Sequence, residues 1–289
     1  PNAIARGLKS QRTGLIGAVV PARGEYWQAV VTAFSRRLVE RDLHLLIFSF
    51  EEAAAVENVL DTVDQYRVDG LVLASSNIGH EHLVRMRRPE RPTIVFNQPA
   101  ASGLLPLITV DNEGGAGLVA RHLVVQGARQ VLYVGGVATA STDQLRYRGA
   151  AQELGAAGIG CAYLEAGDFT YEAGYEIGRR ILQADRLPEA IMVGSDEVAF
   201  GVIDHLRAAR LAIPGDTLVT GFDGLPQASW AGYDLTTLVQ PVDVLVGAAI
   251  DLLVGTADQH DASEPPTVVV PGALRVGATT DRSKGTGHG

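Results

Sequence analysis

Short apolar runs alternate with longer amphipathic stretches along almost the whole chain. The apolar run Gly14–Val20 predicts a buried strand, and apolar positions spaced three and four apart in Tyr26–Arg41 predict a helix after it. Further strands are predicted at 43–48, 69–74, 92–96, 107–110, 130–134, 190–193 and 218–222, and two short apolar runs close the chain at 267–270 and 274–276. Further helices are predicted at 51–66, 80–88, 112–126, 143–157, 171–182, 196–210 and 241–253.

This alternation of strands with long helices is typical of βαβ units and parallel sheets. The pattern runs through one set of elements and then restarts near residue 130, which indicates two similar doubly wound halves of an α/β protein. No stretch rich in Pro, Gly and Ser separates the two sets. We therefore expect two closely connected lobes rather than two domains on a flexible linker.

Composition and charge exclude several classes of protein. The chain has 289 residues, one cysteine and a formal net charge of −9, so it holds no intrachain disulfide and is a poor partner for nucleic acid or an anionic membrane. No apolar run is long enough to span a membrane. The charge is uneven, because residues 1–12 carry three basic and no acidic residues, whereas the remainder carries 21 basic and 33 acidic residues.

Signatures of catalytic and metal sites are incomplete. The seven histidines are scattered, and none belongs to an H-E-x-x-H motif. Gly194-Ser195-Asp196 lacks the G-x-S-x-G spacing of a nucleophile elbow, and Ser195 is more simply the N-cap of the next helix. The glycines at 114–117 have the wrong spacing for a dinucleotide site and lack the lysine of a P-loop. We predict no enzyme, no cofactor and no metal site.

Polar and aromatic residues follow the predicted strands. In open α/β sheets, ligands bind outside the carboxyl ends of the strands, where arginine, asparagine and aspartate suit hydroxyls or carboxylates and aromatic rings cover a sugar or base. Loop polarity and helix capping explain the same positions equally well. The candidates are Arg23, Tyr26, Ser75 and Asn97 in the first set, and Arg146, Phe169, Ser195 and Asp223 in the second.

Several segments occur in the order and spacing of a known family. They include PNAIARGL at 1–8, RTGLIGAVVP at 12–21, VDGLVL at 68–73, TVDNEGG at 109–115, RYRG at 146–149, VTGFD at 219–223 and LTTLVQP at 235–241. With these segments the chain resembles the lactose-repressor (LacI/GalR) family of bacterial transcription regulators, from Pro1 to about Ala278. The resemblance implies a type I periplasmic-binding-protein-like fold, with two doubly wound parallel-sheet lobes joined by three crossovers.

The resemblance also implies boundaries. The N-terminal lobe is expected at 13–110 plus 240–266, and the C-terminal lobe at 111–239 plus 267–280. Residues 1–12 are expected to be a hinge-helix remnant and linker, and 281–289 a disordered tail.

The basic segment at the start matches the hinge helix of the family, which pairs with its dimer mate and enters the minor groove of operator DNA. The resemblance assigns Asn2, Ala5 and Leu8 to this contact, with Leu8 as the wedge between base steps. The family's helix-turn-helix headpiece is expected upstream of Pro1. An eight-residue helix is too short to persist alone in water, so we expect residues 1–12 to be frayed. A simple solubilising extension is the alternative.

The resemblance assigns effector-binding roles residue by residue. Arg146 matches the arginine that grips effector oxygens, Asp223 the acid that accepts hydrogen bonds, and Phe169 the stacking aromatic. Asn97 matches a polar residue that reaches from the first lobe, and Gln240 lies at a crossover. Arg23, Tyr26, Ser75 and Ser195 complete the expected set. Ser195 departs from the family, which usually has asparagine there, and Gly224 stands where an acid often follows.

The implied function is the effector-sensing and dimerisation core of a cytoplasmic transcriptional repressor. It would bind a sugar or sugar derivative, with a purine as the second choice, between its lobes, and act on operator DNA as a homodimer or tetramer without a membrane partner. An extracytoplasmic solute-binding protein of a sugar transporter is the alternative. That protein would share the fold but be monomeric and lack the segment PNAIARGL.

Overall fold

The computed structural model describes residues 12–51, 56–74, 78–88, 90–255 and 264–281. The chain forms two compact units, the first from Pro1–Thr109 and Val242–Val270, the second from Val110–Pro241 and Pro271–Gly289. The backbone therefore passes between the units three times, as the family resemblance implied. Asn2, Ala5, Leu8, Ser75 and all of the tail but Asp281 lie outside the described residues.

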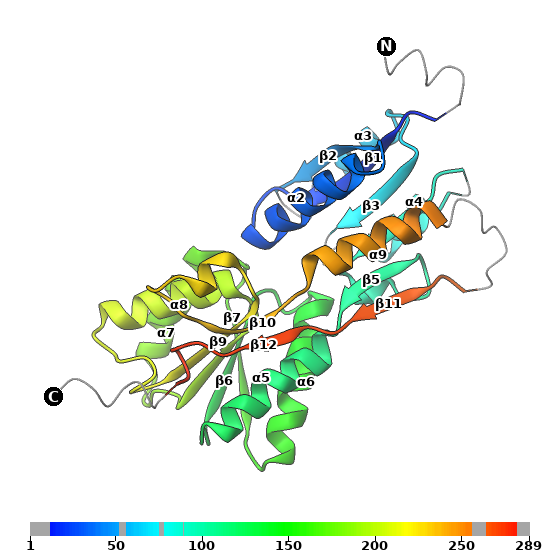
Figure 1. Cartoon of the computed structure of the whole chain (residues 1–289). Helices are drawn as coiled ribbons and strands as arrows, with labels where there is room; N and C mark the ends of the chain where they lie inside the picture. Colours follow the sequence, from blue (N-terminus) through cyan, green and yellow to red (C-terminus); the bar gives the residue numbers. More distant parts are fainter. Residues whose placement is uncertain (1–11, 52–55, 75–77, 89, 256–263, 282–289) are drawn as a thin grey trace. The chain divides into compact units, whose positions relative to one another are not determined.

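The first unit is built on a six-stranded sheet (Figure 1). Strand β1 pairs in parallel with both β2 and β3, so the strand order reverses at β1, as in doubly wound folds. The strands, in spatial order, are β2 (His44–Phe50), β1 (Leu15–Pro21), β3 (Gly70–Ala74), β4 (Thr93–Phe96), β5 (Leu107–Val110) and β11 (Thr267–Val270).

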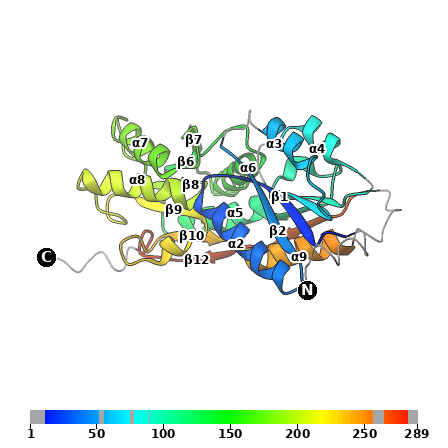
Figure 2. The same ribbon diagram turned by 90° about the horizontal axis from the view of Figure 1, so that it is seen from above.

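Helices cover both faces of this sheet because its strands are apolar on both sides. Helices α2 (Glu25–Val39) and α9 (Val242–Gly255) pack side by side (Figures 1 and 2). Phe34 of α2 contacts Phe96 of β4 with ring centroids 5.5 Å apart. On the other face, α3 (Val56–Val63) and α4 (His80–Met86) bury their apolar residues with the alternate strand positions, among them Leu71 and Leu73.

The second unit repeats this order. Its strands, in spatial order, are β7 (Cys161–Glu165), β6 (Val131–Gly135), β8 (Ala190–Val193), β9 (Leu218–Asp223), β10 (Thr236–Val239) and β12 (Ala273–Arg275). Strand β6 has parallel partners on both sides, as β1 does, and only the β10–β12 pairing among those described in this sheet is antiparallel. The expected pair of doubly wound sheets is thus confirmed.

Close backbone contacts bring the helices of the second unit together in pairs. Helix α5 (Asn112–Val125) packs on α6 (Ser141–Ala156), and α7 (Tyr171–Leu182) packs on α8 (Asp196–Ala208) (Figure 1). A Cβ atom on Gly149 would lie 2.0 Å from the carbonyl oxygen of Glu113, and one on Gly174 would lie 2.1 Å from that of Val198. Because glycine has no side chain at these two positions, the two helices of each pair can come into close contact.

Two short 3₁₀ segments lie at Pro99–Ala101 and Pro226–Ser229.

The structure corrects the sequence interpretation of the lobe boundaries and of two strands. Residues 110, 240 and 241 were expected in the first lobe but belong to the second unit. Residues 267–270 were expected in the second lobe but form β11 of the first sheet, where the amide of Leu107 donates to the carbonyl of Pro266. Strands β7 and β10 were not predicted at all. The first is an edge strand with a short apolar run, 161–164, whose residues are half-buried or exposed. The second begins with two threonines, which look polar in sequence but whose hydroxyls are buried and bonded to residues far away in the chain.

Candidate functional site

Three of the candidate residues meet at the carboxyl end of the second sheet. Arg146 extends from α6, Asp223 is the last residue of β9, and Gln240 directly follows β10. Nη1 of Arg146 lies 3.6 Å from Oδ1 of Asp223, and Nε2 of Gln240 donates to the same oxygen at 2.7 Å. All three side chains are buried. These residues are separated by up to 94 positions in sequence, and the parallel strands bring them to one edge.

The Arg146 guanidinium is held from several sides. Its Nε donates to Oδ1 of Asn112 at 2.8 Å and its Nη1 to the carbonyl oxygen of Gly194 at 2.6 Å. Its Cζ lies 3.8 Å from the ring centroid of Phe222, in the geometry of a cation–π contact. A buried arginine with this many contacts is fixed before any ligand arrives. Such a guanidinium recognises pairs of oxygens on a carboxylate, phosphate or polyol.

Asp196 places a second carboxylate beside Asp223. It is the first residue of α8 and is fully buried, and it accepts hydrogen bonds from Thr237 Oγ1 at 2.5 Å and from the Leu225 amide at 2.8 Å. Burial raises the pKa of Asp196 to about 6 and that of Asp223 to about 7, although Arg146 acts in the opposite direction on both. The carboxyl of Asp223 is therefore poised to accept or donate a hydrogen bond near neutral pH.

Ser195 serves as the N-cap of α8. Its Oγ accepts a hydrogen bond from the Val198 amide at 3.4 Å, which confirms the capping interpretation. Its side chain is buried, and within the described part of the chain its hydroxyl makes no hydrogen bond with Arg146 or Asp223. The structure thus gives Ser195 a local role at the start of α8, beside its assignment to the effector site.

Phe169 lies beside a cluster of aromatic residues that sequence reasoning did not select. A Cβ atom on Gly136 would lie 2.3 Å from the Phe169 ring, so this glycine makes room for the phenyl group. Nearby, Asp143 accepts hydrogen bonds from Tyr133 at 3.0 Å and from Tyr163 at 2.8 Å. Burial raises the pKa of Asp143. The helix from Ser141 therefore begins with one buried acid, Asp143, and presents Arg146 on the next turn.

The remaining described candidates belong to the first unit. Asn97 directly follows β4 and is buried, and its Oδ1 accepts from Thr109 Oγ1 at 3.3 Å. Tyr26, in the first turn of α2, is also buried, with its ring 5.2 Å from that of Trp27. Arg23 is exposed and lies 3.7 Å from Glu51. Ser75 lies outside the described residues.

Asn97 and Asp223 occupy equivalent places in the two sheets. Strand β4 lies between β3 and β5, and β9 lies between β8 and β10, so each residue comes at the carboxyl end of the corresponding strand. Both have a positive φ, 60° at Asn97 and 137° at Asp223. Asparagine and aspartate tolerate this backbone region better than other residues with a side chain, and such outliers gather at binding sites.

Several residues of this arrangement have no simple sequence signal. Asn112, Phe222 and Thr237 contact the charged groups, but each also fits an ordinary role as helix-start, core-strand or strand residue. Asp196 alone had a sequence signal, because it lies shortly after the predicted strand 190–193. Among the residues that the structure describes, no group of three or more His, Cys, Asp or Glu side chains could hold a metal ion, and no helix has the length and hydropathy of a membrane span.

Comparison with known proteins found a matching protein family, proteins of similar sequence and solved structures of similar fold. The family described as a periplasmic binding protein-like domain matches residues 120–280. Catabolite control protein A of Priestia megaterium is 28% identical over 88% of this chain and 78% of its own length. The ribose operon repressor of Escherichia coli (strain K12) is 29% identical over 94% of this chain and 84% of its own length.

A solved structure has the same fold. The LacI family transcriptional regulator from Enterococcus faecium, whose structure contains bound ribose, superposes with a TM-score of 0.80 at 21% identity. The match covers 92% of this chain and 98% of that one.

Proposed function

Since this chain belongs to the family of periplasmic binding protein-like domains, as the core of a LacI-family transcriptional regulator, we propose that it senses a small polyhydroxylated ligand and thereby modulates operator binding. The ligand is a sugar or a sugar derivative, with a purine as the second choice. The observation that carries this proposal is the buried Arg146–Asp223–Gln240 arrangement at the carboxyl end of the second sheet.

The chemistry of these side chains suits a polyol. Arg146 offers fixed N–H donors, Asp223 offers an acceptor, and Gln240 offers an amide with both. Adjacent sugar hydroxyls each donate and accept, so a guanidinium and a carboxylate 3.6 Å apart match two neighbouring hydroxyls. We assign Phe169 to the apolar face of the sugar ring, and Asn97, Tyr26, Arg23, Ser75 and Ser195 to the remainder of the site.

Two relatives support a sugar as the ligand. One is named as a repressor of a ribose operon, and another was solved with ribose bound. In our proposal the chain acts in the cytoplasm as a homodimer, with operator DNA as its second partner through Asn2, Ala5 and Leu8 and a headpiece upstream. Effector binding then changes the affinity for operator by linkage, typically by about 1–3 kcal/mol.

A titration with named sugars tests the ligand class. We expect ribose or another sugar in a panel of pentoses, hexoses and sugar acids to bind with measurable heat in calorimetry. Arg146→Lys should weaken that binding at least about tenfold, because lysine cannot make the paired contacts of a guanidinium. Arg148→Lys, on the same helix but exposed and 3.5 Å from Glu113, is the matched control and should bind as the wild type does.

Two outcomes would overturn the proposal. The site assignment is wrong if Arg146→Lys and Arg148→Lys bind the sugar equally well. The ligand class is wrong if no sugar in the panel binds while a purine base does. Sedimentation of the same protein separates a regulator from a transport protein, since we expect a dimer at micromolar concentration and a transport protein would sediment as a monomer.

A further inference from the structure

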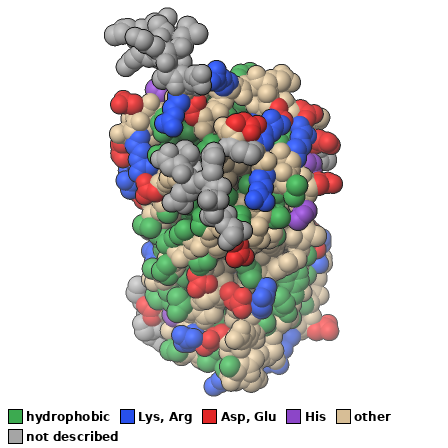
Figure 3. Space-filling view, turned by 90° about the vertical axis from the view of Figure 1, so that its right-hand side faces the viewer, with side chains coloured by type: hydrophobic (Ala, Val, Ile, Leu, Met, Phe, Trp, Pro, Cys, Tyr) green, Lys and Arg blue, Asp and Glu red, His purple; other side chains and the backbone are tan. Residues whose placement is uncertain are grey.

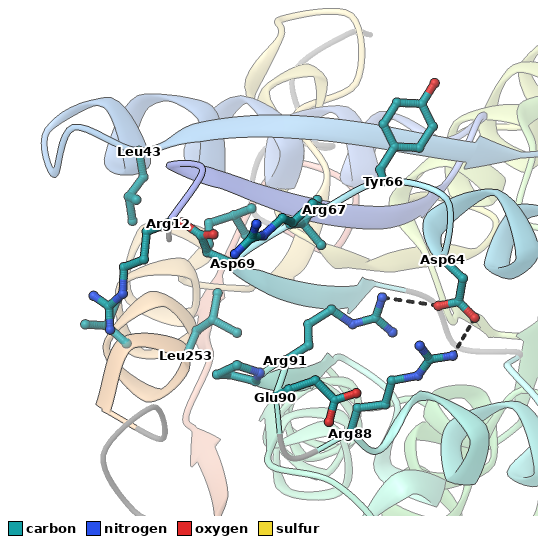
Figure 4. Close-up of a pocket in the computed structure, with 14 residues that line it drawn as sticks. Arg12, Leu43, Asp64, Tyr66, Arg67, Asp69, Arg88, Glu90, Arg91 and Leu253 are labelled. Carbon is teal, nitrogen blue, oxygen red and sulfur yellow. Dashed lines mark hydrogen bonds and ion pairs between the residues drawn. The ribbon is translucent and has the colours of Figure 1, made fainter. Parts of the chain in front are cut away.

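A second hollow lies in the first unit, at the opposite end of its sheet from Asn97 (Figure 4). Its lining residues precede or begin four parallel strands: Leu43 precedes β2, Ile16 lies in β1, Asp69 precedes β3 and Pro92 precedes β4. The cavity has a volume of about 600 Å³, within the range of about 300–1,000 Å³ common for small-molecule sites. It shares no residue with the proposed sugar site.

The walls of this cavity are of two kinds. Ile16, Val68 and Leu253 provide a buried apolar surface, and Leu43 and Pro92 extend it. Four arginines line the same space, accompanied by three acidic residues. The lining is therefore net positive on a chain whose formal charge is −9. On the face of the molecule shown in Figure 3, basic and acidic side chains are likewise intermixed.

Two of the three acidic residues of the lining, Asp64 and Asp69, are bonded within the protein. Asp64 accepts hydrogen bonds from Arg88 at 2.6 Å and from Arg91 at 3.3 Å (Figure 4). Arg85 also donates to it at 3.4 Å, so three guanidinium groups share one carboxylate. Asp69 accepts from the Thr13 amide and hydroxyl and from the Gly14 amide, all within 2.9 Å. The third acid, Glu90, is exposed and acts on Arg91 as a nearby negative charge, so the four arginines exceed the acids of the lining by one.

Arg91 is the buried cation of this lining. Its side chain is only 8% exposed, yet its described contacts are a 3.3 Å bond to Asp64 and a 3.5 Å contact with the Met86 sulfur. Among the described residues, its Nε has no hydrogen-bond partner. Burial lowers the pKa of this guanidinium. A buried cation whose donors are poorly used is costly unless another group compensates it.

We propose that this cavity is a second ligand site, which takes a small organic anion with a phosphate or carboxylate group on an apolar body. The anionic group lies against the guanidinium groups of Arg91 and Arg88, since such forks match phosphate and carboxylate oxygens. The apolar body lies on Ile16, Val68 and Leu253. Arg12 and Arg67, which are exposed, border the opening.

Calorimetry with phenyl phosphate, benzoate and inorganic phosphate tests this proposal on the intact chain. We expect the better of the two aromatic anions to bind at least about tenfold more tightly than inorganic phosphate, because its ring buries apolar surface. Arg91→Gln should weaken that binding by a similar factor. Arg85→Gln is the matched control, because Arg85 contacts the same Asp64 but does not line the cavity.

A second variant covers the case in which Arg91→Gln fails to fold. Arg67 is exposed and lines the cavity, so Arg67→Gln should fold normally and weaken binding about threefold or more, equivalent to about 0.7 kcal/mol. The proposal is overturned if inorganic phosphate binds as tightly as both aromatic anions, if Arg67→Gln binds them as the wild type does, or if Arg85→Gln loses as much as Arg91→Gln. It is also overturned if only duplex DNA binds. The variant Arg146→Lys should keep full affinity for the anion, which separates this site from the sugar site.

Discussion

Nη1 of Arg146 lies 3.6 Å from Oδ1 of Asp223, with both side chains more than nine-tenths buried. Phe222, the residue before Asp223, covers the guanidinium with its ring. In a buried pair of this kind, each charge offsets the cost of burying the other. Removal of one partner therefore leaves the other charge buried and unpaired. The stability of the second unit and its proposed ligand site therefore depend on the same two residues.

Removal of the guanidinium should destabilise the fold. We expect Arg146→Ala to lower the free energy of unfolding by about 3–5 kcal/mol, measured by urea denaturation. Arg148→Ala on the same helix removes only an exposed ion pair, and we expect a change below about 1 kcal/mol. Equal losses in the two variants would contradict the role given to the buried pair.

The stability of the protein should depend on pH through Asp223. Its folded-state pKa of about 7 lies above the ordinary value of 3.8, mainly because of burial, so the folded protein holds a proton that the unfolded chain has released. The stability that this bound proton adds to the folded protein is fully present below pH 4 and is lost as the pH rises to about 7. We expect the free energy of unfolding of Asp223→Asn to decline less with rising pH. Each unit of difference between the folded and unfolded pKa corresponds to about 1.4 kcal/mol of that free energy.

Urea denaturation of wild type and Asp223→Asn at several pH values between 4 and 8 measures this difference. Asp196 titrates in the same range, so a smaller decline should remain in the variant. Parallel curves for the two proteins would show that Asp223 does not carry the effect.

The hydroxyl of Thr237 should stabilise the ionised form of Asp196. It donates to Oδ1 at 2.5 Å inside the protein, and this bond lowers the pKa of the carboxyl against the effect of burial. Thr237→Val keeps the shape but removes the donor, so we expect a loss of about 1–3 kcal/mol at pH 8 and a smaller loss at pH 5. Thr237→Ser retains the hydroxyl and is the control. A loss in Thr237→Val that is the same at both pH values would contradict this account.

Two glycines of α6 should respond in opposite ways to alanine. A Cβ atom on Gly149 would meet the Glu113 carbonyl at 2.0 Å, so Gly149→Ala must push α5 and α6 apart, at a cost of about 1–3 kcal/mol or more. Gly155 has no atom within 4 Å of that position, and Gly155→Ala should be neutral or stabilise by up to about 1 kcal/mol. Thermal unfolding of both variants checks the pair. A stable Gly149→Ala protein would show that the two helices can separate freely.

The alternation of apolar runs and amphipathic stretches was enough to predict the α/β class and two doubly wound sets. Strands buried on both faces appear in the sequence as continuous apolar runs, whereas helices buried on one face have apolar residues three and four positions apart. The same signal failed for β10. Its first residues, Thr236 and Thr237, look polar in sequence, but their hydroxyls are satisfied by Thr280 and Asp196. The boundaries that the family resemblance implied placed residues 267–270 in the wrong lobe, and the apolar run itself does not indicate which sheet edge it joins.

Position after a strand, together with family resemblance, was enough to name Arg146, Asp223 and Gln240 individually. Only the tertiary structure decided that they share one buried cluster with Asn112, Asp196 and Phe222, because burial and partner distance depend on segments far apart in the chain. It alone also gathered Arg91, Arg88 and Asp64 around a cavity at the amino ends of the first sheet. Residue types and periods are local properties of a sequence. The electrostatic environment of a charge is not, because it is set by whatever the fold brings within a few ångströms.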